Sequence, residues 1–124
     1  MGVYKGIAQD NVTINSGRAV LQSMRNTNNV PVSKTASFTV GADENFIICN
    51  GSAANVSVTL PTASASAGRV IVIKNLSATY TVISAATNVK PANSNTAGTA
   101  ILAATAGAWA MLVCDGTDWV IMAS

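Results

Sequence analysis

The stretch AWAMLVCDGTDWVIM, residues 108–122, decides the fold of this chain. Two apolar runs flank the tetrapeptide Asp-Gly-Thr-Asp at 115–118. An Asp-Gly pair between apolar runs predicts a β-hairpin, because glycine accepts the positive φ that a tight turn requires. Each run is apolar on both faces, so a water-exposed position at a sheet edge suits neither. We therefore expect this hairpin to be central in a sheet or buried against a neighbouring subunit.

Upstream of the hairpin, the sequence predicts short strands and almost no helix. Polar and apolar residues alternate over 36–40 and again over 56–60, as they do in strands with one buried face. Residues 69–75 contain an apolar run on both faces, which is typical of a strand that is central or covered on both sides. Further short strands are expected at 46–49 and 80–84.

About seven short strands predict an all-β fold, in the form of an antiparallel β-sandwich or jelly-roll-like domain. The connectors at 61–68 and 86–99 are rich in Pro, Gly, Asn and Ser and are expected to be surface loops. We expect this domain to span residues 36–124.

Residues 1–35 differ from the rest, because their apolar residues are scattered between Asn-rich gaps. Four of the seven basic residues lie here, opposed only by Asp10. We interpret this stretch as an extended N-terminal arm for docking or assembly, which gains its order on an acidic partner surface. An arm that adds strands to its own domain is the alternative. The residues expected to dock are Tyr4, Lys5, Ile7, Arg18, Arg25 and Lys34.

The composition indicates a non-enzymatic protein that is part of a larger assembly. Charged residues make up only 10% of the 124 residues, so small uncharged polar side chains must form most of the surface. Such a surface repels other proteins poorly, although a soluble monomer is the alternative. The chain has no histidine, the usual general base and the commonest metal ligand. Two cysteines cannot make a tetrahedral zinc site, and no phosphate-binding glycine loop is present, so we expect no cofactor.

Nucleic acid and membrane partners are not expected either. The net charge is only +2 and the basic residues form no cluster. The longest apolar run, at 106–114, is too short to cross a bilayer, and no signal peptide is visible. We expect synthesis in a reducing cytoplasm, where Cys49 and Cys114 would be buried free thiols.

Several motifs resemble those of tailed-bacteriophage virion proteins, in the β-rich domains of tail fibres, head fibres and capsid decoration proteins. These are Val-Thr-Leu-Pro at 58–61, Ala-Gly-Arg-Val-Ile-Val-Ile-Lys-Asn at 67–75, Thr-Val-Ile at 81–83 and Asp-Gly-Thr-Asp-Trp at 115–119. The resemblance covers roughly residues 36–124. It implies a virion structural protein that forms a trimer or another symmetric homo-oligomer and binds the major capsid protein or another virion protein.

The absence of long shaft repeats favours a capsid decoration or cement protein, which binds the outer capsid surface and stabilises the shell. The alternative is a small fibre-tip or adhesin module that binds host-surface glycans, and such a site would need exposed aromatic side chains. The residues expected to lie in oligomer contacts or in the core of the terminal hairpin are Trp109, Met111, Val113, Trp119 and Ile121.

Overall fold

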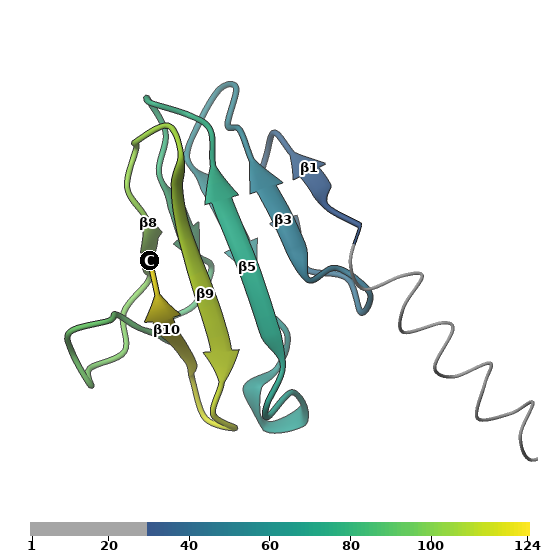
Figure 1. The fold of residues 1–124 in the computed structure, drawn as a ribbon, viewed down its shortest axis with the longest axis vertical. Coiled ribbons are helices and arrows are strands. Elements are labelled where there is room, and N and C mark those ends of the chain that lie inside the picture. Colours follow the sequence, from purple (N-terminus) through teal and green to yellow (C-terminus); the bar gives the residue numbers. More distant parts are fainter. Residues whose placement is uncertain (1–29) are drawn as a thin grey trace, which may run out of the picture.

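The computed structural model describes residues 30–124, and this part of the chain is all-β, as expected. Its strands form two layers, with β10, β9, β5, β3 and β1 in the front layer of Figure 1 and β8 behind. One short 3-10 turn, η1 (Ala63–Ala65), is the only helical element in these residues. The strands are β1 (Val32–Lys34), β2 (Phe38–Thr39), β3 (Phe46–Cys49), β4 (Val56–Thr59), β5 (Val70–Asn75), β6 (Val82–Ser84), β7 (Val89–Lys90), β8 (Ala100–Leu102), β9 (Ala108–Cys114) and β10 (Trp119–Ala123).

The chain alternates between the two layers from β1 to β9. One sheet has six strands in the order β1-β3-β5-β9-β10-β7, and the other has four in the order β2-β4-β6-β8. Each of the first six strands therefore pairs with a strand two places away in sequence. This winding places β5 and β9 in the middle of the larger sheet. Both strands have apolar residues on both faces, a pattern that predicts a central position.

The predicted antiparallel pairing is wrong for much of the domain. Five of the eight strand pairs are parallel: β1–β3, β3–β5, β2–β4, β4–β6 and β10–β7. The chain crosses to the opposite sheet before it returns, so it re-enters each sheet in the same direction. Only β5–β9, β6–β8 and the β9–β10 hairpin are antiparallel. Alternating hydrophobicity reports which face of a strand is buried, and it carries no information about strand direction.

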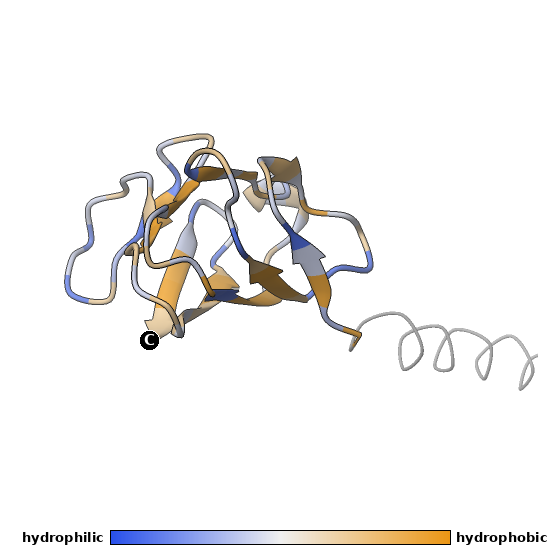
Figure 2. Ribbon diagram, turned by 90° about the horizontal axis from the view of Figure 1, so that it is seen from above, coloured by the Kyte–Doolittle hydropathy of each residue, from blue (hydrophilic) through white to orange (hydrophobic). Residues whose placement is uncertain are grey.

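One apolar core lies between the two sheets, and both contribute to it. Seen end-on in Figure 2, the strands of both layers are largely apolar and the connecting loops largely polar. Trp119 is fully buried, and its indole N–H donates to the carbonyl of Pro61 at 3.0 Å. This bond ties the last strand to the connection that follows β4. Cys49 and Cys114 are buried free thiols, as predicted.

Three short strands differ from the sequence-based expectation. β1 lies within the predicted arm, yet it pairs with β3 of the same domain. β7 lies within the predicted loop at 86–99, where Val89 is fully buried. β8 was not predicted from the sequence either. Strands of two or three residues contain too few side chains for an alternating pattern to be recognised.

Candidate interaction surface

The side of the six-stranded sheet that points away from the core is mostly apolar across its four inner strands, β3, β5, β9 and β10, while the edge strands turn Ser33 and Lys90 to the same side. In β9 the residues at 110, 112 and 114 are buried, so those at 109, 111 and 113 point outward. The same alternation in β3, β5 and β10 turns further apolar side chains to this side. We call this surface the outer sheet face. It comprises Phe46, Ile48, Val70, Val72, Lys74, Trp109, Met111, Val113, Val120 and Met122.

Strand register brings these side chains together in rows. Val72 of β5 lies opposite Phe46 of β3 on one side and opposite Met111 of β9 on the other. A second row runs from Val70 through Val113 to the outward residue of β10 that pairs with it. Directly opposite residues on neighbouring strands have Cβ atoms about 4.5–5.5 Å apart. The outer sheet face is therefore continuous across four strands.

Much of this surface is open to solvent. The exposed fractions are 45% for Trp109, 42% for Val70, 38% for Phe46 and 60% for Met122. β3, β5, β9 and β10 have four, six, seven and five residues, which at about 3.3 Å per residue and about 4.8 Å strand spacing give a footprint of roughly 350 Å². The largest apolar patch of a typical monomer measures about 300–600 Å² and is often functional.

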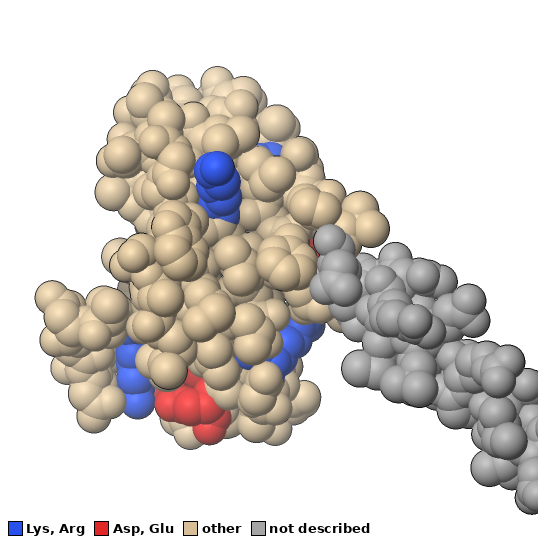
Figure 3. Space-filling model, in the orientation of Figure 1, with Lys and Arg blue, Asp and Glu red and all other residues tan. Residues whose placement is uncertain are grey.

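Charge is almost absent from the outer sheet face. Lys74 is its single ionisable member and lies between Ile48 and Trp109 in their row, while Lys90 of the edge strand β7 lies opposite Val120 beside the face. Figure 3 shows this side of the molecule as mostly uncharged, with acidic side chains flanked by basic ones at its lower end and a further basic side chain nearer the top. A surface of this kind is suited to a dry, apolar contact rather than to an ionic one.

The structure divides the predicted hairpin residues into two groups. Trp109, Met111 and Val113 belong to the outer sheet face, whereas Trp119 and Ile121 are buried in the core. The sequence could not separate these groups, because both arms of the hairpin are apolar at every position. It also missed the outward residues of β3 and β10, whose pattern gave no sign of which face would meet the core.

Of the predicted docking residues, only Lys34 is described; Tyr4, Lys5, Ile7, Arg18 and Arg25 lie outside residues 30–124. The Lys34 amine donates to the Glu44 carboxylate at 2.9 Å and lies 5.0 Å from the centroid of the Phe38 ring. Lys34 thus has partners within its own domain.

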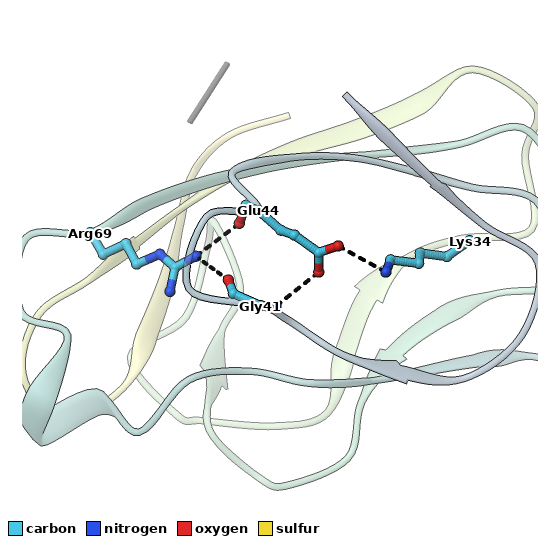
Figure 4. Close-up of polar contacts among 4 residues, drawn as sticks. All are labelled: Lys34, Gly41, Glu44 and Arg69. Carbon is cyan, nitrogen blue, oxygen red and sulfur yellow. Dashed lines mark hydrogen bonds and ion pairs between the residues drawn. The ribbon is translucent and has the colours of Figure 1, made fainter. Parts of the chain in front are cut away.

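Glu44 is the centre of a polar cluster at the β1 side of the domain (Figure 4). Its carboxylate accepts the backbone N–H of Gly41 at 2.8 Å as well as the Lys34 amine. The Arg69 guanidinium donates to the carbonyls of Gly41 and Glu44, both at 2.8 Å. The hydrogen bond from Gly41, followed by that from Lys34, lowers the pKa of Glu44. The cluster fixes the connection between β2 and β3 against the start of β5.

A second polar cluster lies at the β7 side of the sheet. Lys90 is 3.8 Å from Asp115 and 3.7 Å from Asp118. The Asp115 carboxylate accepts the backbone N–H groups of Thr117 and Asp118, so it shapes the hairpin turn. Next to these residues is an open hollow of about 530 Å³ between residues 91–95 and β10.

The chemistry of the described residues offers little beyond these contacts. Residues 30–124 contain no group of three or more His, Cys, Asp or Glu side chains that could hold a metal ion. In the same residues, no helix has the length and apolar character needed to span a membrane.

The chain matches no protein-family model, and no curated protein and no solved structure was found to be similar to it.

Proposed function

We propose that this chain is a non-enzymatic structural protein of a bacteriophage particle. It acts as a capsid decoration or cement protein that binds the outer shell surface and stabilises the shell. The observation that carries this proposal is the outer sheet face, roughly 350 Å² of nearly uncharged apolar surface across four strands. A subunit of a permanent assembly can bury such a surface.

The two sheets around one core support a sandwich-type module, although the parallel winding distinguishes it from a jelly roll. In this proposal the module forms a homo-oligomer, for which the motif resemblance implies a trimer. Residues 1–29 hold three basic residues and one acidic residue, a net charge of +2, and serve as the arm that contacts the shell. Several arms in one oligomer would strengthen the attachment through avidity.

The direct test uses particles of the phage that encodes the chain. Mass spectrometry should find the protein in purified particles at a stoichiometry that matches symmetry-related sites. Purified protein should also bind shells that lack it and raise the temperature at which they break open. Absence from the particles together with no binding to such shells would refute the proposal.

The role of the arm is tested by deletion of residues 1–29. All the strands and core residues that the structure describes lie within residues 30–124, so we expect the shortened chain to fold. We expect it to lose shell binding, as measured by co-sedimentation, while circular dichroism shows an unchanged fold. A shortened chain that unfolds would support the alternative, in which the arm is part of its own domain. One that still binds shells would show that docking lies elsewhere.

The second candidate function is a fibre-tip or adhesin module that binds host-surface glycans. Two observations favour it: Trp109 exposes 45% of its surface, and the hollow beside β10 is lined by Asn93, Asn95 and Lys90. Amide side chains and an exposed indole ring can bind a sugar. Glycan-array binding that is lost in Trp109→Ala or Asn93→Ala would favour this function over shell decoration.

A further inference from the structure

The outer sheet face lacks a partner among the described residues, and its composition restricts what can cover it. Besides the Lys74 amine and the Trp109 indole N–H, its outward side chains offer no conventional hydrogen-bonding groups apart from weakly accepting methionine sulfurs. A partner rich in hydroxyl or charged groups would leave those groups without hydrogen bonds on contact, at a considerable energetic penalty. The partner must therefore be apolar and nearly uncharged where it touches this face.

The N-terminal residues of the same chain do not fit this description. Residues 1–29 carry a net charge of +2, and the outer sheet face adds a further cation, Lys74, with no anion to oppose it. Their apolar residues are interrupted by polar stretches such as Asn-Thr-Asn-Asn at 26–29. Covering the face with this segment would bring like charges together and bury amides.

We propose that the outer sheet face is covered by the same face of a second copy of this chain. Two such faces meet the requirement for an apolar, nearly uncharged partner. Sheets pack face to face about 10 Å apart, with side chains from both interdigitating. Contact between two copies through the same patch generates a closed dimer with two-fold symmetry, in place of the trimer that the motif resemblance implies, and such a dimer cannot grow into fibres.

Lys74 is compatible with this contact because of its position. It lies opposite Trp109 in a row near the end of the central strands, one residue from the end of β5. A lysine at such a position can lay its apolar stem along the contact while its amine reaches water beyond the strand ends. The centre of the face, around Val72 and Met111, contains no ionisable side chain.

The size of the face indicates a weak association. Two faces of roughly 350 Å² give a footprint of roughly 700 Å², below the value of about 1,000 Å² that stable specific interfaces exceed. The assembly should therefore depend on protein concentration. This inference rests on the proposed function for its biological setting, but it can fail independently, since a virion protein could oligomerise through another surface.

Sedimentation velocity of the full chain between about 1 and 100 µM tests the inference. We expect Met111→Lys to weaken self-association about 100-fold or more, because it places an unpaired cation at the centre of the contact. The matched control is Thr59→Lys, which adds the same charge to an exposed strand position in the other sheet and should leave association unchanged. Circular dichroism establishes that both variants are folded.

A cross-linking measurement keeps the test decisive if Met111→Lys does not fold. Val72→Cys should be joined to a second copy by a short bismaleimide, whereas Thr59→Cys should not. The native Cys49 and Cys114 are buried and should not react. A wild-type chain that stays monomeric at 100 µM would overturn the inference. So would Met111→Lys that assembles like the wild type, or Thr59→Cys that cross-links as readily as Val72→Cys. Detection of the protein in phage particles in any of those cases would leave the proposed function standing.

Discussion

The two tryptophans of the terminal hairpin provide a matched test of the fold, because only one of them is in the core. Trp119 is fully buried and donates a hydrogen bond to Pro61, whereas Trp109 is 45% exposed on the outer sheet face. We expect Trp119→Ala to lower the free energy of unfolding by about 3–5 kcal/mol, from the lost burial and the cavity left behind. A domain of this size has about 5–15 kcal/mol in total, so the variant should be close to unfolding.

Urea unfolding followed by far-UV circular dichroism measures this difference without relying on tryptophan fluorescence. Trp109→Ala is the control, measured at a concentration where the chain is monomeric. Its side chain is already half in water, so its loss should lower the free energy of unfolding by about 1 kcal/mol. The reasoning is refuted if the two variants have equal stability, or if Trp119→Ala lies within 1 kcal/mol of the wild type.

Three further predictions follow from individual contacts. The pKa of Glu44 is lowered in the folded state, so its contribution to stability should be present above its ordinary pKa of 4.5 and be lost as the pH falls through the lowered value. The melting temperature of Glu44→Gln should therefore lack this part of the decline in acid. Both cysteines are buried, and burial raises the pKa of Cys49 to about 11. Alkylation followed by mass spectrometry should therefore label the two buried thiols slowly in the native state and quickly in denaturant, and quick native labelling would contradict the structure. Gly51→Ala should destabilise the domain by about 1–3 kcal/mol in urea unfolding, because the added Cβ would lie 2.7 Å from the backbone oxygen of Ala54; an unchanged midpoint would show that this loop yields easily.

Much of the fold could be predicted from the sequence because strand signals are local. Alternation placed β4 correctly within one residue, and Asp-Gly placed the turn between β9 and β10, where Gly116 has a φ of +95°. The route of the chain could not be predicted, because whether neighbours are parallel depends on which sheet the intervening strand joins. That choice is made by packing among distant residues, and no local pattern records it.

The candidate surface was only partly predictable for a related reason. The sequence indicated that the terminal hairpin holds more apolar surface than a single core can bury, and this is where Trp109 and Met111 lie. It could not indicate that Trp119 would point inward, because alternate positions in the hairpin are chemically alike. The charge of Lys34 predicted a docking residue, but in the structure Lys34 pairs with Glu44. This contact depends on where β1 packs, which the local sequence does not indicate.

The central strand β5 has apolar residues on both of its faces. Its sequence predicted a strand that is central or covered on both faces, and the structure makes it central between β3 and β9 while leaving Val70 and Val72 on an uncovered side. Central position alone does not require apolar residues on the outer side, since an antiparallel or mixed sheet with one solvated face normally carries polar residues there. The neighbouring outward residues of β9 are apolar as well, so the pattern spans strands and is not an isolated exception. Any cover for the outward side of β5 and β9 must therefore come from outside residues 30–124, and in our proposal a second copy of the same sheet supplies it.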